Sequence, residues 1–180
     1  MALRIGGGGA RGRRLRAAGK TTRPPLARVR TSLMDTLAGR LEGARVLDVY
    51  AGSGSLGFEA LSRGAAECVF VESDAAAVAG IRADAAALGL EKNARVVRGD
   101  VAAGLAALVA DDGTGFDVVF LDPPFKVDAA AVAEEAAVLV ARLGVLVWRV
   151  PRGRVLPPRV GVLALTRQRR YGISKVGSYT

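Results

Sequence analysis

Short apolar runs alternate with longer segments of helical periodicity through most of the chain. The runs that predict strands are Arg45–Tyr50, Glu67–Glu72, Ala94–Arg98, Phe116–Leu121 and Val145–Val150. The segments that predict helices between them are Ser55–Arg63, Asp74–Leu88, Val101–Ala110 and Asp128–Arg142. Strands that are apolar throughout and separated by helices form a parallel sheet with helices on both faces. Because such crossovers are right-handed, the pattern predicts a doubly wound, Rossmann-like α/β fold.

The C-terminal residues predict a different arrangement from the alternating part. Val160–Leu165 and Arg170–Tyr179 have strand-like patterns, and no helix lies between them. Two such strands pair as an antiparallel hairpin. We therefore expect a mostly parallel seven-stranded sheet with this hairpin at one edge.

The N-terminal residues predict a small extension in front of the α/β fold. Leu3–Ile5 and Arg11–Ala17 are separated by the glycine run Gly6–Gly9, which favours a hairpin. A helical pattern then starts near Val29 and ends at Gly43. These elements divide the chain into an N-terminal extension at residues 1–43 and an α/β domain at residues 44–180.

The composition restricts the chemistry that the chain can perform. It has 180 residues, of which 51% are apolar, so a sizeable core is expected. Histidine is absent, which excludes mechanisms with a histidine base and histidine metal ligands. The one cysteine, Cys68, excludes an intrachain disulfide and a cysteine-rich zinc site. The single cysteine predicts a reduced, cytoplasmic protein. No apolar run is long enough to predict a membrane span. We also expect a monomer without a metal.

The charge is distributed in three blocks. Residues 1–40 have a net charge of +9, residues 41–144 of −8 and residues 145–180 of +8. Basic segments of this kind attract polyanions, and phosphate contacts supply most of the sequence-independent affinity for nucleic acid. Aromatic residues make up only 5% of the chain, which argues against extended stacking on single-stranded bases. The basic ends therefore predict a nucleic-acid partner.

A glycine-rich loop follows the first predicted strand. Gly52, Gly54 and Gly57 have the G-x-G-x-x-G spacing between a strand and a helix, which is typical of nucleotide-type cofactor sites. Dinucleotides and S-adenosylmethionine both bind at such loops. Asp48 lies near the end of the strand, and its carboxylate suits the cationic methionine end of S-adenosylmethionine better than a pyrophosphate. From the glycine loop alone, a nicotinamide dehydrogenase stays open.

Two further acids follow the next two strands. Glu72 is placed to accept hydrogen bonds from the ribose hydroxyls of either cofactor. Asp100 can accept a hydrogen bond from the adenine amino group and can also act as the N-cap of the following helix. The residues expected to bind the cofactor are Asp48, Tyr50, Ala51, Gly52, Ser53, Gly54, Glu72, Ser73, Asp100 and Val101.

A rigid corner, Asp122-Pro123-Pro124-Phe125, ends the fourth strand of the alternating part. Consecutive prolines cannot continue a sheet and make a stiff turn. In a doubly wound sheet the first and fourth strands are neighbours, so this corner should face the glycine loop. Asp122 and the Pro123 carbonyl can accept the two hydrogens of an exocyclic amino group and orient its lone pair. With Phe125 stacking on the base, these four residues are the expected catalytic set.

Several motifs along nearly the whole chain are characteristic in combination. They are L-R-I-G-G followed by G-R-R-L, T-R-P, R-V-R-x-S-L, V-L-D-V-Y-A-G-S-G-S-L-G-F-E-A-L-S-R-G-A, F-V-E-S-D, F-L-D-P-P-F and R-R-Y-G. With them the chain resembles the bacterial 16S ribosomal RNA guanine-N2 methyltransferases. The resemblance implies S-adenosylmethionine as cofactor and 16S rRNA in an assembling small ribosomal subunit as partner. It also implies that the N-terminal extension holds RNA, through Arg11, Arg13, Arg14, Arg23, Arg28 and Arg30.

The chain departs from the family pattern on the expected RNA side. The departures are Pro25, Ala27, Thr31, Met34 and Ile173-Ser174. They leave the chemistry in place and leave the particular guanine open. Two other functions stay open as well. An adenine-N6 methyltransferase of DNA or RNA shares the Asp-Pro-Pro-Phe corner but generally needs a target-recognition region. A non-catalytic RNA-binding factor for ribosome assembly is the other, and the intact corner argues against it.

Overall fold

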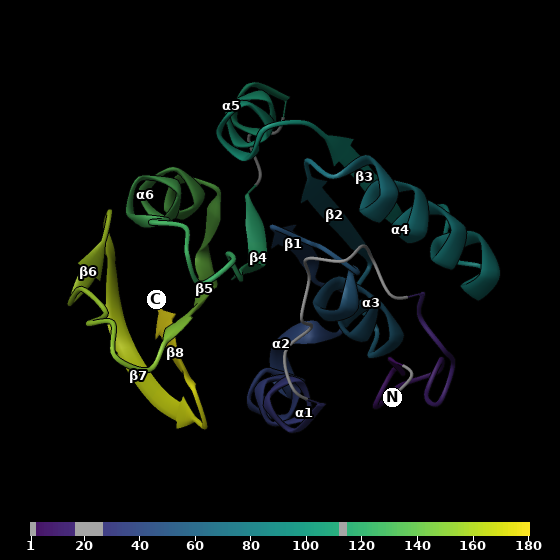
Figure 1. Ribbon diagram of the computed structural model, residues 1–180, viewed down its shortest axis with the longest axis horizontal. Coiled ribbons are helices and arrows are strands. Elements are labelled where there is room, and N and C mark those ends of the chain that lie inside the picture. The colour runs from purple at the N-terminus through teal and green to yellow at the C-terminus, as the bar shows by residue number, and fades with distance from the viewer. Residues whose placement is uncertain (1–2, 17–26, 112–114) are drawn as a thin grey trace.

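The computed structural model describes residues 3–16, 27–111 and 115–180 (Figure 1). Within these residues, one eight-stranded sheet has the order β3-β2-β1-β4-β5-β8-β7-β6. The strands are β1 (Arg45–Val49), β2 (Glu67–Glu72), β3 (Ala94–Arg98), β4 (Phe116–Leu121), β5 (Val140–Pro151), β6 (Arg159–Val160), β7 (Leu163–Tyr171) and β8 (Ser174–Tyr179). Strands β1 to β5 pair in parallel, and β8, β7 and β6 pair antiparallel. The predicted doubly wound fold with an antiparallel C-terminal edge is thus confirmed.

Helices cover both faces of the sheet (Figure 1). They are α1 (Ala27–Thr36), α2 (Ala38–Leu41), α3 (Ser55–Ser62), α4 (Ala75–Leu88), α5 (Val101–Asp111) and α6 (Ala130–Val138). Helices α1 to α4 pack on one face in a core cluster that includes Leu33, Phe58 and Ile81. Helices α5 and α6 pack on the other face around Leu105 and Ala133. In the part of the chain that is described, no helix is both long and apolar enough to cross a membrane.

The parallel register brings the ends of three strands to one edge of the sheet, here called the carboxyl edge. Val49 of β1 pairs with Val71 of β2 on one side and with Leu121 of β4 on the other. The residues that follow these strands therefore lie side by side. The glycine loop and the Asp-Pro-Pro-Phe corner are thus neighbours, as the sequence predicts.

The C-terminal hairpin differs from the prediction in its turns. A turn at Gly172 separates β7 from β8, so the predicted strand Arg170–Tyr179 is interrupted. Gly161 makes a second turn and places Arg159–Val160 beside the start of β7 as an eighth strand. Gly161 and Gly172 have φ angles of +54° and +53°, a left-handed conformation that favours glycine. The predictions of seven strands and of one strand at Val160–Leu165 were wrong because apolar patterning does not report these turns.

Two helices are shorter than predicted. Helix α6 ends before the predicted Arg142, since the backbone is already paired as β5 from Val140 onward. The first helix is interrupted at Leu37 and continues as α2. The Leu37 amide is shared between the carbonyl oxygens of Leu33 and Met34, each at 3.1 Å, which is typical of a helix end that tightens.

The predicted N-terminal hairpin is present, with an antiparallel bridge between its two arms. Ile5 and Leu15, one from each arm, are buried in the same core cluster as α1 and α3. At the hairpin turn Gly8 contacts α3 so closely that a Cβ would lie 1.7 Å from the Ser62 carbonyl oxygen. The hairpin therefore shares the core of the α/β part.

Candidate active site

Three carboxylates lie close together at the carboxyl edge. Asp48 lies near the end of β1, Glu72 ends β2, and Asp122 directly follows β4. Burial raises the pKa of Asp48 well above its usual range, and the hydrogen bond from the Gly57 amide opposes that change. The charges of Asp122 and Glu72 raise the pKa of Asp48 further. The edge therefore has concentrated negative charge in a poorly hydrated place, which a bound cation would stabilise.

The loop after β1 is tied to two of these carboxylates. The Gly52 amide donates to Glu72 Oε2 at 2.7 Å, and the Gly57 amide donates to Asp48 Oδ2 at 3.0 Å. Among the described residues, Tyr50 is the only non-glycine residue in the left-handed region, with φ +61°. Such a conformation costs of order 1–3 kcal/mol and is found mainly at functional sites. The loop is thus held in one shape by side chains from two strands.

Packing explains two of the three loop glycines. A Cβ on Gly57 would lie 2.3 Å from the Phe70 ring and 2.6 Å from Cys68 Sγ, and a Cβ on Gly54 would lie 2.9 Å from the Phe58 ring. These glycines let α3 approach β2 closely, which is the role of the third glycine in such loops. Burial raises the pKa of the Cys68 thiol well above its usual range, as for an inert core cysteine.

The predicted cofactor residues beyond the loop also contact backbone amides. Glu72 Oε1 accepts a hydrogen bond from the Ser73 amide at 2.8 Å. Asp100 Oδ1 accepts one from the Ala102 amide at 3.0 Å, which is the predicted N-cap of α5. Burial raises the pKa of Tyr50, and the nearby charge of Asp100 adds to the effect. The structure buries Ala51, Gly52, Ser53, Gly54 and Val101 and leaves Ser73 and Asp100 exposed.

The Asp-Pro-Pro-Phe corner is held by an arginine that sequence reasoning missed. Arg149 of β5 donates from Nε to Asp122 Oδ1 at 2.5 Å and from Nη1 to Ser174 Oγ at 3.2 Å. Its guanidinium lies 4.9 Å from the centre of the Phe125 ring, in cation–π contact. The corner also touches β1, because the Asp122 amide donates to the Val49 carbonyl oxygen at 3.4 Å. Arg149 therefore fixes both the carboxylate and the aromatic ring of the corner.

The ionisation of Asp122 reflects two opposing effects. Burial raises the pKa of Asp122, while the charge and the hydrogen bond of Arg149 lower it. Asp122 Oδ2 accepts no hydrogen bond from the described part of the chain, so this oxygen is left for a ligand. A sequence signal for Arg149 existed, since it interrupts the apolar run V-L-V-W-R-V of β5. An arginine inside a buried strand needs a carboxylate partner.

Two small hollows meet at Arg149, each with about 10 Å³ of free volume, which is room for roughly one water molecule. One is lined by apolar residues of α1, α3, β4, β5 and β8 together with Arg30, Asp122 and Arg149. The other is lined by Pro123, Pro124 and Phe125 with residues of β5 and the segment after it, Arg149 included. The predicted catalytic residues therefore line two water-sized hollows beside the Arg149 side chain.

The arginines predicted to hold RNA are placed differently from one another. Arg11 and Arg14 are exposed, and Arg13 is exposed with one guanidinium nitrogen 2.5 Å from the Ala87 carbonyl oxygen. Arg23 lies outside the described residues. Arg28 lies in α1, but its side chain is outside the described part. Arg30 is only 3% exposed, so the expectation that it contacts RNA is corrected by the structure.

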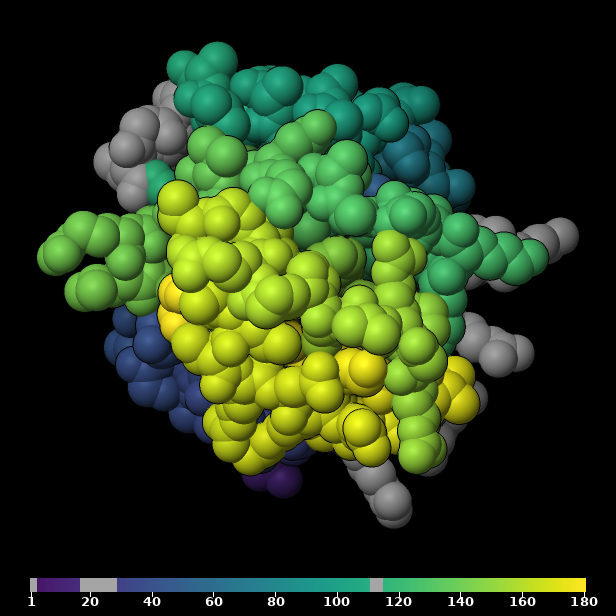
Figure 2. Space-filling model, turned by 90° about the vertical axis from the view of Figure 1, so that its left-hand side faces the viewer, coloured from purple at the N-terminus to yellow at the C-terminus, as the bar shows by residue number. Residues whose placement is uncertain are grey.

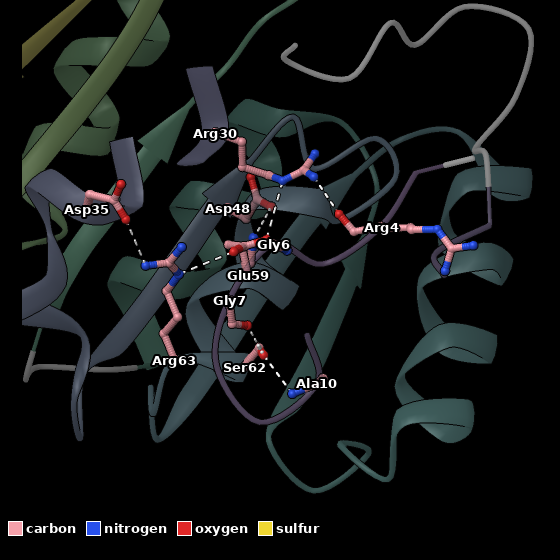
Figure 3. A network of polar contacts seen from close by, with 11 residues as sticks. Arg4, Gly6, Gly7, Ala10, Arg30, Asp35, Asp48, Glu59, Ser62 and Arg63 are labelled. Atoms are coloured by element: carbon pink, nitrogen blue, oxygen red, sulfur yellow. Dashed lines mark hydrogen bonds and ion pairs between the residues drawn. The ribbon is translucent and has the colours of Figure 1, made fainter. Parts of the chain in front are cut away.

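Arg30 instead belongs to a buried polar network around Glu59 of α3 (Figure 3). Its Nε lies 3.4 Å from Glu59 Oε2, and its Nη2 donates to the Arg4 carbonyl oxygen at 2.5 Å. The fully buried Glu59 carboxylate also accepts hydrogen bonds from the Gly6 amide at 2.8 Å and from Arg63 Nε at 3.2 Å. The network joins the N-terminal hairpin, α1 and α3, because each carries one of the paired groups.

Known proteins are similar to this chain over nearly its whole length. Residues 3–180 match the family model described as Conserved hypothetical protein 95. The chain is 38% identical over 181 residues to "Putative rRNA methyltransferase YlbH" of Bacillus subtilis, which covers 98% of both proteins. It is 42% identical over 125 residues to "Ribosomal RNA small subunit methyltransferase D" of Escherichia coli, covering 69% of this chain and 61% of that protein. A solved structure of a hypothetical protein from Thermus thermophilus superposes with a TM-score of 0.85 at 36% identity over 98% of both chains.

Proposed function

Because the chain belongs to the family described as Conserved hypothetical protein 95, whose relatives are named rRNA methyltransferases, we propose that it methylates the N2 amino group of a guanine in 16S rRNA. The methyl donor is S-adenosylmethionine. The observation that carries the proposal is the placement of Asp122 beside the acidic glycine loop, with one carboxylate oxygen held by Arg149 and the other open.

The acidic edge fits the methyl donor. S-adenosylmethionine, when bound, supplies an activated methyl group on a positively charged sulfur and also carries an ammonium group. Asp48 and Glu72 concentrate negative charge around the glycine loop, whereas the charge of Asp122 is paired with Arg149. Burial is the main cause of the raised pKa of Asp48, and the charge of Glu72 adds to it. A phosphate-bearing cofactor would be repelled by Asp48 and Glu72. The residues that would hold the methyl donor are those predicted from the sequence, from Asp48 through the glycine loop to Glu72, Ser73, Asp100 and Val101.

Asp122 and Pro123 would orient the amino group of the target base. The lone pair of an exocyclic amine is delocalised into the ring, so the nitrogen is a poor nucleophile until its hydrogens are held out of the ring plane. Asp122 Oδ2 and the Pro123 carbonyl oxygen can accept those two hydrogens. Both acceptors also stabilise the positive charge that grows on the nitrogen during alkylation. The nitrogen becomes acidic as it is alkylated, so it can release a proton to the Asp122 carboxylate or to water, and no histidine base is needed.

Phe125 and Arg149 would form a stack with the base. The Phe125 ring is 37% exposed, and Arg149 lies against it. A base swung out of its RNA helix can stack on the part of the ring that Arg149 leaves free, at about 1–3 kcal/mol per stacked base. Arg149 is here a positioning residue, since it acts through Asp122 and Phe125.

The test is transfer of a labelled methyl group to small-subunit RNA from a strain that lacks the protein, followed by mapping of the modified nucleotide. We expect one guanine to be labelled at N2. Label at an adenine would assign the adenine-N6 function instead. Tight RNA binding without any transfer, to free RNA or to assembling particles, would favour the non-catalytic assembly factor.

A further inference from the structure

A row of arginines on β7 continues outward from the candidate active site. We propose that Arg167 and Arg169 bind the phosphates of the RNA strand beside the target base. This inference rests on the proposed function for its substrate class. Both arginines lie outside the predicted N-terminal RNA-binding residues and outside the predicted catalytic residues.

The strand register places these arginines in line with Asp122. Arg149 of β5 pairs with Val176 of β8, and Val176 pairs with Arg169 of β7. Side chains that are level across neighbouring strands point to the same face of a sheet. Strands lie about 4.8 Å apart, so Arg169 lies about 10 Å beyond Arg149 along the row. Asp122 is level with Arg149 on the neighbouring strand side, because the residues just before them, Leu121 and Trp148, are paired. Asp122 is therefore the inner end of the same row.

The row lies on the face of the sheet that α1 covers. The side chain of Arg169 is 3.4 Å from Thr36 Oγ1, and the Tyr171 hydroxyl is 3.0 Å from Ser32 Oγ, so the end of β7 borders α1. In Figure 2 the C-terminal residues form a broad face, and the residues of α1 and α2 lie at its border. The hollow that contains Asp122 is lined by α1 residues as well. The arginine row therefore leads from the outer face toward this hollow.

The side chains of the row are available to a ligand. Thr166 to Arg170 are five consecutive exposed residues. In the described part of the chain, no carboxylate pairs with Arg167, Arg169 or Arg170, whereas Arg149 and Arg154 each have an aspartate partner. Residues 145–180 contain no acid at all. Unpaired guanidinium groups on an exposed strand are complementary to phosphate.

The N-terminal arginines are less well placed for contacts near the target base. The hairpin turn packs at Ser62, the last residue of α3, whereas α3 begins at the carboxyl edge. A helix of eight residues is about 12 Å long, so the hairpin turn lies about that far from the edge, and Arg13 contacts Ala87 near the C-terminal end of α4. The N-terminal arginines remain candidates for contacts with a more distant part of the RNA.

Edge protection is the competing explanation for the row. Strand β6 pairs only with Leu163 and Ala164 among the described residues of β7, so the rest of that edge has no partner strand there. Charged side chains on such edges prevent strand-to-strand aggregation. A glutamate would serve that purpose as well as an arginine, whereas it would repel RNA.

The experiment compares R167E/R169E with the control R82E/K92E, which reverses two exposed charges on and after α4. Binding of a small-subunit rRNA transcript is measured between low and high salt. We expect the slope of log K against log salt to become shallower by about 1.4 in the first variant, from about 0.7 per lost phosphate contact, and to stay unchanged in the control. Thermal melting confirms that each variant is folded, and R167Q/R169Q provides a second, neutral version with the same expected slope.

If the glutamate and glutamine variants bind RNA with the wild-type slope, the row does not contact RNA. If only the glutamine variant aggregates and RNA binding by the glutamate variant is unaffected, the row is an edge guard. If the wild type transfers no methyl group but the R167E/R169E and R167Q/R169Q variants bind RNA with a shallower salt slope, the proposed function fails and the RNA contact of this row stands.

Discussion

Replacing Arg149 with methionine tests how the catalytic corner is organised. Methionine keeps much of the volume of the arginine stem but removes the charge, the hydrogen bond to Asp122 and the cation–π contact with Phe125. The side chains of Arg149 and Asp122 are 17% and 10% exposed, so the pair is largely buried. Breaking such a pair leaves a carboxylate in a poorly hydrated place without its partner.

The expected loss of stability follows from the geometry of the Arg149–Asp122 ion pair. With charge centres about 4 Å apart and an effective dielectric constant of about 20, the attraction is about 4 kcal/mol. This is a ceiling, because Asp122 can take up a proton instead of staying charged. We expect the R149M variant to lose about 2–3 kcal/mol of unfolding free energy at neutral pH. We also expect kcat/KM for methyl transfer to fall about 100-fold, as when one preorganised group is lost from a charge-stabilising site.

The pH dependence separates this role from a merely structural one. Burial raises the pKa of Asp122 and Arg149 lowers it, so in R149M the pKa rises further. The acid limb of the kcat/KM profile should therefore move to higher pH. The Asp122 carboxyl has its ordinary pKa in the unfolded chain and a higher pKa in the folded protein. The extra instability of R149M should consequently be absent at acid pH and grow as pH rises toward the folded pKa.

Two controls complete the test. R149K keeps the charge but not the planar group over Phe125, so it should restore the acid limb and only part of the rate. R152M removes an exposed arginine just after β5 and should change neither the acid limb nor the rate. An acid limb of R149M that coincides with the wild-type limb would refute the idea that Arg149 keeps Asp122 ionised.

Three further predictions concern the chemistry, the loop and the polar network. D122A should abolish methyl transfer while S-adenosylmethionine binding, measured by calorimetry, stays nearly unchanged; equal loss of both would contradict the separate roles. G57A should lower the melting temperature clearly, because its Cβ would lie 2.3 Å from Phe70, and a melting curve like the wild type would show that α3 can shift. R30M should cost about 2–3 kcal/mol in urea unfolding, since Glu59 is fully buried, yet leave the RNA affinity of the folded protein unchanged. A loss of RNA affinity in folded R30M would indicate that Arg30 contacts RNA after all.

The order of the strands and helices could be predicted from the sequence because the information is local. Each parallel strand is a short apolar run, and each helix has its own periodicity and stop signals. The doubly wound topology that this alternation predicts then makes β1 and β4 neighbours. For that reason the glycine loop and the Asp-Pro-Pro-Phe corner could be placed at one edge before any coordinates were known.

The turns of the C-terminal hairpin were decided by backbone geometry that apolar patterning does not encode. Gly161 and Gly172 adopt left-handed angles, and this divides the segment into three strands where two were expected. Among the described glycines, Gly57 and Gly104 lie inside helices without a positive φ, so the residue type alone does not mark a turn.

The pairing of charged side chains was decided only by the tertiary structure. Arg30 stands in a basic segment that resembles an RNA-binding arm, yet α1 packs so that its guanidinium meets Glu59 in the interior. Arg149 and Asp122 are 27 residues apart and meet because β4 and β5 are adjacent in parallel register. A sequence by itself determines which charges exist and on which elements they lie. Whether an arginine is solvated, paired or open to a ligand depends on which distant segment packs against it, since burial makes an unpaired charge too costly to leave.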